Sequence, residues 1–425
     1  MTLLVFVGSL LGAMAIGVPV AFSLMFCGVV LMWYMGMFNT AIIAQNMISG
    51  ADTFTLLAIP FFILAGELMN SGGLSRRIID FAIACVGHIR GGLGIVAIMA
   101  AIIMASISGS AAADTAALAA ILIPMMAKAG YNVPRSAGLI ASGGIIAPVI
   151  PPSMAFIVFG VAANVSITQL FMAGIVPGLL MGLSLVATWL FVVRKDNITP
   201  LPKTTAKQRL QATARAGWAL GMPVIILGGI KAGIMTPTEA AVVAAAYALF
   251  VGMVVYRELK PSELPHVLLR AAKSTSIIMF LVCAALVSAW LITAANIPNE
   301  VVGYIEPLID RPMLLMFAIM VLILIVGTAL DLTPTILILT PVLMPIIKQA
   351  GIDPVYFGVL FIMNTCIGLI TPPVGVVLNV VSGVGRVPLG RVTAGVLPFL
   401  LTQVAVLFLL VIFPDIVLVP LQYLR

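Results

Sequence analysis

The sequence predicts an all-α polytopic membrane protein built from two inverted repeats, and three observations lead there: composition, an internal repeat and a reversal of loop charge. Of 425 residues, 62% are hydrophobic and 8% are charged, whereas soluble domains carry about 25% charged residues. Apolar segments long enough for spanning helices of ~20 residues recur without period-2 alternation. Helices rather than a β-barrel therefore satisfy the backbone inside a bilayer.

The internal repeat joins residues 120–152 to residues 341–373 at an offset of 221. Matching positions include Pro124 and Pro345, Gly130 and Gly351, and the dipeptides Pro151–Pro152 and Pro372–Pro373. The repeated segments thus share the residues that bend or interrupt helices.

Loop charge reverses between the two copies. Residues 75–90 hold three Arg and one acid, whereas residues 299–311 hold three acids and one Arg. Basic loops face the cytoplasm, so equivalent loops are expected on opposite sides of the membrane. Two copies of opposite orientation are typical of secondary transporters.

Each repeat is expected to contain a re-entrant helical hairpin followed by a broken helix. The hairpin legs, split at SISGSAAAD and GTALDLTPT, have about 16 residues and rise about 24 Å, less than the roughly 30 Å hydrocarbon core. The next helix is interrupted at GGIIAPVIPP and NTCIGLITPP. Broken backbone at membrane depth is tolerated only where it is buried or lines a cavity.

In order along the chain we predict the following regions: an N-terminal scaffold helix region, 1–50; inverted repeat 1, 51–193, with hairpin 92–127 and broken helix 135–165; a cytoplasmic basic loop, 194–216; a scaffold helix pair, 217–256; and inverted repeat 2, 257–425, with hairpin 313–347 and broken helix 356–384. Residues 3–34 form one long helix or two short ones, which leaves the side of the N-terminus open. The N-terminus lacks the features of a cleaved secretory signal.

Five acids lie in or against apolar segments, where a carboxylate is costly unless it is paired, capping or ligating. They are Asp52, Glu67, Asp114, Glu239 and Asp331. Asp114 and Asp331 fall at the two hairpin tips. Asp331 is either a helix N-cap or a cation ligand, and Asp114 either stabilises a helix N-terminus or serves the transport site. Glu239 fits a first-turn helix acid. Asp52 and Glu67 fit positions at the membrane interface or positions paired with basic residues of the loops.

Other function classes find little support. The sequence lacks HExxH, GxSxG and a GK-containing phosphate loop and has two His, which argues against an enzyme or a nucleotide-driven pump. Its net charge of +7 sits in short loops, where membrane topology rather than nucleic acid explains it. We expect no cofactor, no zinc site and no nucleic-acid partner. A passive channel with polar midplane residues remains the alternative.

Several long blocks resemble the large membrane subunit of tripartite ATP-independent periplasmic (TRAP) transporters. These blocks are SGADTFTLLAIPFFILAGELMNSGGLSRRI, MASISGSAAADTAAL, LIASGGIIAPVIPPS, GTALDLTPTILILTPVLMPIIKQAGIDPVYFGV and NTCIGLITPPVGVVLNV. The resemblance implies Na⁺-coupled import of a carboxylated solute across the bacterial inner membrane by an elevator mechanism. It also implies two partners: a small membrane subunit on a separate chain and a periplasmic solute-binding protein. A sialic acid or related sugar acid is favoured as substrate, with a C4-dicarboxylate or another organic acid as the alternative.

The same resemblance implies the site residues. Sodium ligands are expected at Ser106, Ser108, Ser110, Gly143 and Gly144 in the first repeat, and at Thr328, Asp331, Thr333, Asn364 and Gly368 in the second. The substrate carboxylate is expected between them, near Ser110, Asp114, Ser153 and Thr371.

Overall fold

The computed structural model describes residues 1–196 and 198–424, with side chains undescribed at a few of these positions. The first half of the chain contains ten α-helices in the described range: α1 (Thr2–Ala15), α2 (Val20–Tyr34), α3 (Thr40–Ala51), α4 (Ala58–Ser71), α5 (Leu74–Val86), α6 (Gly92–Ser108), α7 (Ala111–Lys128), α8 (Val133–Gly144), α9 (Met154–Ala163) and α10 (Ile167–Val192). Short 3₁₀ segments lie at Phe54–Leu57 and Val193–Lys195.

The second half continues in the same style, with ten more α-helices among its described residues: α11 (Ala206–Lys231), α12 (Pro237–Phe250), α13 (Leu264–Ala294), α14 (Ile297–Ile309), α15 (Pro312–Gly327), α16 (Leu332–Gln349), α17 (Pro354–Gly368), α18 (Val376–Gly385), α19 (Leu389–Ile412) and α20 (Asp415–Leu424). A π-helical turn, Val251–Val255, ends α12, and a 3₁₀ turn, Pro261–Glu263, precedes α13. Within the described residues, eight helical segments are long and apolar enough to cross a membrane. The predicted all-α membrane fold is confirmed.

The offset of 221 residues extends over almost the whole fold. Shifted by 221, α6 to α10 fall on α15 to α19, α5 falls on α14, and α4 falls on the second half of α13. Even α1 and α2 fall on the end of α11 and on α12 with its π-helical turn. Residues 1–50 and 217–256, which the sequence predicts to be a scaffold outside the repeats, therefore correspond to one another.

Helix caps repeat at the same offset. Ser110 caps α7 and Asp331 caps α16, while Asn132 and Asp353 cap α8 and α17. Each cap residue accepts a hydrogen bond from a backbone N–H of the first turn, which satisfies a donor that the helix itself leaves unpaired. Cis peptide bonds also recur at equivalent positions, Pro151–Pro152 and Pro372–Pro373.

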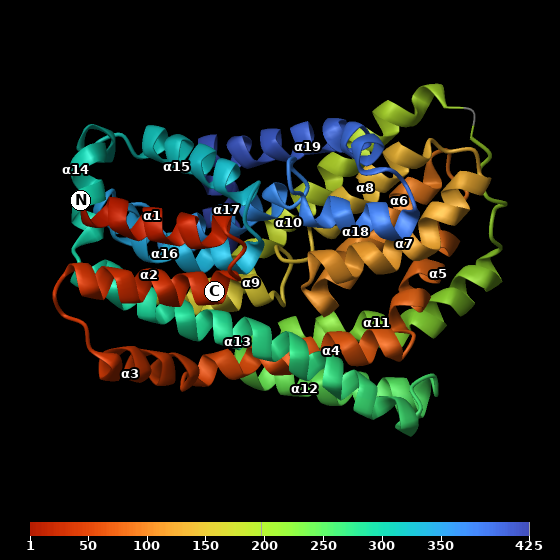
Figure 1. The fold of residues 1–425 in the computed structure, drawn as a ribbon. Helices are drawn as coiled ribbons and strands as arrows, with labels where there is room; N and C mark the ends of the chain where they lie inside the picture. The colour runs from red at the N-terminus through yellow and green to blue at the C-terminus, as the bar shows by residue number, and fades with distance from the viewer. Residues whose placement is uncertain (197, 425) are drawn as a thin grey trace.

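The two hairpins enter the molecule from opposite ends (Figure 1). The helix pair α6 and α7 spans Gly92–Lys128, and α15 and α16 span Pro312–Gln349, close to the hairpin limits that the sequence predicts. The broken helices are α8 with α9 and α17 with α18, interrupted at residues 145–153 and 369–375. The turns of the two hairpins and the breaks in the two broken helices all lie toward the middle of the bundle, far from both ends (Figure 1).

The N-terminal segment adopts the two-helix alternative. Helices α1 and α2 pack side by side and antiparallel, joined by residues 16–19. Each has 14 or 15 residues and rises about 22 Å, less than the membrane core. The turn at Pro19 therefore also ends inside the bundle.

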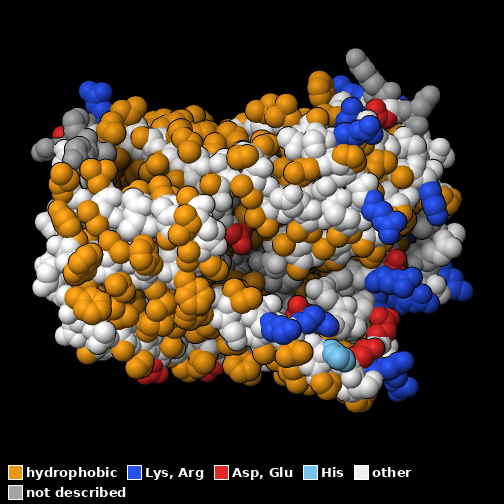
Figure 2. Space-filling view, in the orientation of Figure 1, with side chains coloured by type: hydrophobic (Ala, Val, Ile, Leu, Met, Phe, Trp, Pro, Cys, Tyr) orange, Lys and Arg blue, Asp and Glu red, His pale blue; other side chains and the backbone are white. Residues whose placement is uncertain are grey.

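The charged side chains define the two ends of the bundle. Figure 2 shows Lys and Arg gathered at the end where α5 and the start of α11 lie, whereas apolar side chains cover most of the remaining face. Basic residues mark the cytoplasmic side. The α6–α7 hairpin thus enters from the cytoplasmic side and the α15–α16 hairpin from the other.

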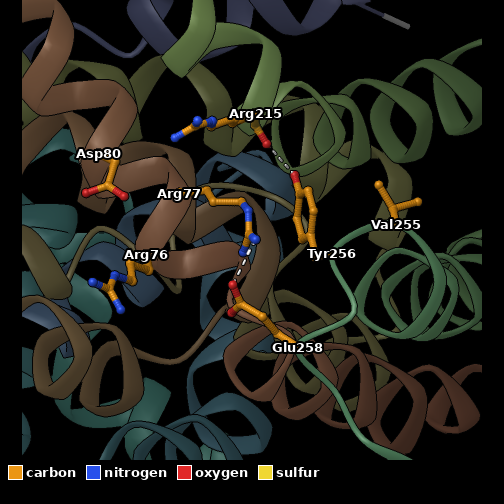
Figure 3. Close-up of a pocket in the computed structure, with 7 residues that line it drawn as sticks. All are labelled: Arg76, Arg77, Asp80, Arg215, Val255, Tyr256 and Glu258. Carbon is orange, nitrogen blue, oxygen red and sulfur yellow. Dashed lines mark hydrogen bonds and ion pairs between the residues drawn. The ribbon is translucent and has the colours of Figure 1, made fainter. Parts of the chain in front are cut away.

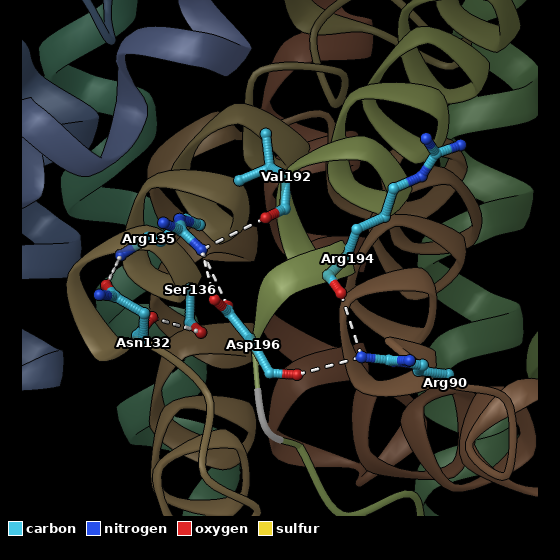
Figure 4. Close-up of polar contacts among 7 residues, drawn as sticks. All are labelled: Arg90, Asn132, Arg135, Ser136, Val192, Arg194 and Asp196. Atoms are coloured by element: carbon cyan, nitrogen blue, oxygen red, sulfur yellow. Dashed lines mark hydrogen bonds and ion pairs between the residues drawn. The ribbon is translucent and has the colours of Figure 1, made fainter.

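The segment after α10 is anchored by two arginines (Figure 4). Arg135, at the start of α8, forms an ion pair with Asp196 at 2.8 Å, and Arg90 donates to the Arg194 carbonyl at 3.1 Å. Further along, the Thr199 N–H donates to the Ala129 carbonyl, and the Thr204 hydroxyl donates to the Ala84 carbonyl of α5. The basic loop therefore connects the α8 region to α5 through defined contacts.

GxxxG spacing is typical of close helix packing, and three of the pairs with this spacing are Gly8/Gly12, Gly178/Gly182 and Gly217/Gly221. Gly178 and Gly182 do pack closely, because a Cβ at either position would collide with an isoleucine side chain. At Gly8, Gly12 and Gly217, an added Cβ would meet no described atom within 4 Å. These three glycines face outward.

The inverted arrangement predicts opposite accessibility for two equivalent loop positions, Ile89 and Asp310. Ile89 is 42% exposed, and Asp310 is also exposed. We expect Ile89→Cys to react with a membrane-impermeant maleimide only from the cytoplasmic side and Asp310→Cys only from the periplasmic side. The parent chain, with its four native cysteines, gives the background labelling. Reaction of both variants from the same side would contradict the inverted topology.

Candidate functional site

A cavity of about 580 Å³ lies where the two hairpin tips meet α2 and α13. The first hairpin contributes Gly109 and Ser110, and the second contributes Asp331 and Thr333. On the opposite wall are apolar residues of α2 and α13, among them Phe22 and Phe280, whose rings lie 5.2 Å apart. The cavity therefore lies between the two hairpins on one side and helices α2 and α13 on the other.

The second leg of each hairpin and the second half of each broken helix begin at this cavity, as does α2 at Val20. Its lining includes the first residues of α7, α9, α16 and α18, namely Ala111, Met154, Leu332 and Val376. The N-terminal end of a helix carries unpaired N–H groups and a partial positive charge, so it favours an anion. Both hairpins and both broken helices thus direct their positive ends at one space.

Side-chain charge in the cavity is sparse. Asp331 is the one charged side chain among the described residues that line it, and neither Lys nor Arg is present in that lining. The helix termini therefore supply the positive potential. Asp331 itself is exposed and caps α16, since its Oδ1 accepts from the Leu332 N–H at 2.8 Å.

The tip of the first hairpin buries polar atoms beneath the cavity. The Ser108 hydroxyl donates to Asp114 Oδ1 at 2.5 Å. Asp114 and Thr115 are fully buried, and Asp114 Oδ2 and Thr115 Oγ1 have no hydrogen-bond partner among the described residues. Gly144 of α8 lies directly against the Thr115 hydroxyl, where any Cβ would collide with it. This group of oxygens suits a small hard cation.

The other residues expected around this first sodium site are placed as follows. The Ser106 hydroxyl donates to the Ile103 carbonyl at 2.7 Å, and the Ser110 hydroxyl accepts from the Ala113 N–H at 3.4 Å. Gly143 packs against Ala101 of α6. Ser108, Asp114, Thr115 and Gly144 come together most clearly.

The residues expected around the second sodium site share the junction of α15, α16 and α17. Asn364 is fully buried, donates to the Met320 carbonyl at 2.6 Å, and leaves its Oδ1 without a described partner. Gly368 lies against the backbone of Gly327. The Thr328 hydroxyl donates to the Ile325 carbonyl, which leaves its oxygen lone pairs available. The unpaired Asn364 oxygen fits a cation ligand.

Of the four residues expected around the substrate, one lines the cavity and three do not. Ser110 lines the cavity, together with Asp331 and Thr333, which the resemblance assigns to sodium. Asp114 lies beneath the cavity, and Ser153 is buried as the N-cap of α9, with its hydroxyl on the Pro148 carbonyl. The Thr371 hydroxyl donates to the Ile367 carbonyl. Asp114, Ser153 and Thr371 are not among the lining residues.

Sequence reasoning missed the wall formed by α2 and α13. Pro19, Phe22, Ile277 and Phe280 belong to it. One signal was present in the sequence: Pro19, in GVPV, interrupts an apolar run and so marks a turn inside the membrane region.

Two of the remaining three acids in or against apolar segments, Glu67 and Glu239, have structural partners. Glu67 of α4 forms an ion pair with Arg270 of α13 at 2.8 Å. Glu239 completes a capping box with Thr236 at the start of α12, as expected for a first-turn acid. Asp52 is exposed after α3. Across the described residues, no group of three or more His, Cys, Asp or Glu side chains forms a metal cluster.

The family model of the tripartite ATP-independent periplasmic transporter, DctM component, matches residues 7–416. The 2,3-diketo-L-gulonate TRAP transporter large permease protein of Escherichia coli (strain K12) is 55% identical over 425 residues, covering 100% of both chains. The sialic acid TRAP transporter large permease protein of Vibrio cholerae is 40% identical and covers 95% of each chain. The C4-dicarboxylate TRAP transporter large permease protein of Pseudomonas aeruginosa is 41% identical, covering 88% of this chain and 87% of that protein.

Among solved structures, the YdaH transporter of Alcanivorax borkumensis has a similar fold. Its TM-score is 0.61 at 15% sequence identity, and the match covers 87% of this chain and 86% of that one. At that identity the similarity concerns the fold alone.

The close contact between Gly327 and Gly368 leads to a prediction about thermal stability. A Cβ at Gly368 would lie 2.6 Å from the Gly327 carbonyl carbon, so Gly368→Ala must separate α15 from α17. Overpacking of this kind costs about 1–3 kcal/mol, and we expect a lower midpoint of thermal unfolding in detergent. Gly383→Ala on α18 is the matched control, because an added Cβ there meets no described atom within 4 Å. Equal midpoints for the two variants would show that the contact is not tight.

Proposed function

The chain belongs to the DctM component family of tripartite ATP-independent periplasmic transporters, and on that premise we propose that it imports a sugar acid coupled to Na⁺ by an elevator mechanism. It is a large permease subunit for organic acid import in the bacterial inner membrane. Members of this family work with a small membrane subunit and a periplasmic binding protein. The proposal concerns the ion, the substrate and the movement.

The convergence of four helix N-termini on one cavity carries the proposal. A carboxylate placed there meets the positive ends of α7, α9, α16 and α18 without having to break a salt bridge with Lys or Arg. Helix dipoles and free N–H groups hold anions at such places in transporters. A carboxylated solute fits this cavity better than a cation or a neutral sugar does.

The negative charge of Asp331 in the cavity lining is a physical reason why substrate binding would require a bound cation. Two carboxylates about 6 Å apart repel each other by roughly 3 kcal/mol at an effective dielectric constant of 20. A substrate carboxylate in the cavity therefore binds poorly beside Asp331 unless a cation neutralises that side chain. Asp114 and Thr115 at the first hairpin tip and Asn364 on α17 have buried oxygens with no described partner. Na⁺ held by these oxygens would promote substrate binding, and substrate would promote Na⁺ binding.

The names of the relatives support the proposed substrate class. The relative that covers the whole chain at 55% identity is named for 2,3-diketo-L-gulonate, and one at 40% identity is named for sialic acid. Both solutes are sugar acids. A relative of 41% identity named for C4-dicarboxylates keeps those as the alternative.

The mobile part is proposed to be the group formed by both hairpins and both broken helices. These elements pack on one another, α7 on α18 and α9 on α16, while α2, α4, α12 and α13 pack on one another. The cavity lies between the two groups. Sliding of the first group along the second would carry the cavity across the membrane, whereas a passive channel needs no such displacement.

The test is uptake into proteoliposomes that contain the chain with its small subunit. Labelled 2,3-diketo-L-gulonate, sialic acid and succinate are compared, with and without the matching binding protein and with and without an inward Na⁺ gradient. We expect accumulation of a sugar acid that requires both. Flux that ignores the gradient and the binding protein would establish the passive channel instead.

Asp331→Asn separates coupling from binding. Because the neutral side chain no longer requires a cation beside it, the Na⁺ dependence of uptake is expected to weaken by about tenfold, within the range of ordinary coupling energies. Asp353→Asn, which caps α17 outside the cavity, is the control. Unchanged Na⁺ dependence in Asp331→Asn would contradict the coupling role.

Thr333 tests the anionic character of the substrate. Thr333→Asp adds a second carboxylate to the cavity lining, and we expect uptake to fall by about tenfold or more from charge repulsion. Thr333→Asn, of similar size and uncharged, controls for shape. Equal effects of the two substitutions would show that the substrate does not bind as an anion.

A further inference from the structure

A second cavity, of about 440 Å³, lies at the cytoplasmic end of the bundle. It is formed by α5, the first half of α11 and the segment that follows α12 (Figure 3). Its charged lining residues are Arg76, Arg77, Asp80, Arg215 and Glu258. We call it the arginine pocket. It shares no lining residue with the cavity at the hairpin tips.

One wall of the arginine pocket is firmly built. Arg77 forms an ion pair with Glu258 at 2.8 Å, and its guanidinium lies 3.7 Å from the ring centroid of Tyr256. The Tyr256 hydroxyl in turn donates to the Arg215 carbonyl at 2.7 Å, and burial raises the pKa of Tyr256, so the donor stays protonated. Three separate segments are thereby held together around the pocket (Figure 3).

The other two arginines are available. Arg76 and Arg215 are exposed, and within the described part of the chain neither guanidinium takes part in an ion pair or a hydrogen bond. Glu258 is already occupied by Arg77, so Asp80 is the one acid left opposite two free guanidinium groups. Arginine binds phosphate through parallel N–H groups. The pocket therefore has a positive surplus suited to a phosphate ester.

The pocket also borders an exposed apolar surface. Trp218 lies one turn beyond Arg215 on α11 and is 46% exposed, while Phe250 and Val254 beside it are 50% and 54% exposed. The rings of Trp218 and Phe250 are 6.5 Å apart. Exposed aromatic residues next to basic residues are typical of the boundary between hydrocarbon and headgroups.

We propose that the arginine pocket binds the headgroup of an anionic phospholipid from the cytoplasmic leaflet. Arg76 and Arg215 hold the phosphodiester, Arg77 remains on Glu258 and Tyr256, and the acyl chains lie along Trp218, Phe250 and Val254. Anionic lipids of the cytoplasmic leaflet bind basic pockets between transmembrane helices in this way. Since α5 and α11 pack on each other, the lipid would also brace that pair.

The experiment titrates lipid onto the chain in complex with its small subunit, in detergent, with bound lipid counted by native mass spectrometry. The probes are dioleoyl phosphatidylglycerol, dioleoyl phosphatidylcholine and inorganic phosphate. We expect phosphatidylglycerol to bind at least tenfold more tightly than phosphatidylcholine. Arg76→Gln with Arg215→Gln should weaken phosphatidylglycerol binding by about thirtyfold, from the typical contribution of two basic residues near a membrane surface.

Two further variants keep the test decisive. Asp80→Asn removes the opposing charge and is expected to tighten phosphatidylglycerol binding, which a folding defect would not do. Lys128→Gln with Lys273→Gln removes two exposed charges outside the pocket and is expected to leave binding within twofold of the parent.

Several results would overturn the proposal. Equal binding of the two lipids would do so, as would equal loss in the Arg76/Arg215 and Lys128/Lys273 double variants. Displacement of phosphatidylglycerol by millimolar inorganic phosphate would identify a free phosphate as the ligand. Lipid binding seen for the isolated chain but abolished by the small subunit would make the pocket a protein contact.

Discussion

Backbone groups inside a membrane have no water to bind, and this constraint determines most of the structure. Every helix break must end where protein or cavity can satisfy its free N–H and C=O groups. The chain breaks at the two hairpin tips and in α8–α9 and α17–α18, and it brings all four breaks to one place. The N-caps Ser110, Ser153 and Asp331 satisfy part of the demand. The backbone N–H groups that these caps leave unpaired face a cavity, which is lined by positive helix ends and few charged side chains.

The inverted repeat explains why the hairpins and broken helices meet the cavity at equivalent positions, while the side chains at those positions differ. Ser110 and Asp331 occupy equivalent positions, as do Gly143 and Asn364 and also Asp114 and Thr335. One hairpin presents a hydroxyl where the other presents a carboxylate. The buried carboxylate, Asp114, lies in the first repeat, and the exposed one, Asp331, lies in the second. Each repeat thus contributes one acid, but at different depths.

Much of this architecture could be predicted from the sequence, because breaks, repeats and loop charge are local signals. The hairpins, the broken helices and the opposite orientation of the repeats follow from Gly, Pro, Lys and Arg placement. The wall of the cavity could not be predicted in the same way. Phe22 and Phe280 are ordinary apolar residues in ordinary apolar helices, and only the packing of α2 on α13 makes them part of a site. Gly8 and Gly12 have the spacing of a helix-packing motif, but no described atom lies within 4 Å of a Cβ added at either position.

The anchored basic loop limits how far the first hairpin and α5 can separate while both of its anchoring hydrogen bonds are intact. Thr199 is hydrogen-bonded to Ala129, beside the first hairpin, and Thr204 is hydrogen-bonded to Ala84 on α5. Only five residue steps join these anchors, and a fully extended chain of that length reaches roughly 17 Å. The loop is therefore a tether as well as a connection. In the elevator movement proposed above, this length would limit how far the first hairpin could travel relative to α5 before one of these two hydrogen bonds had to break.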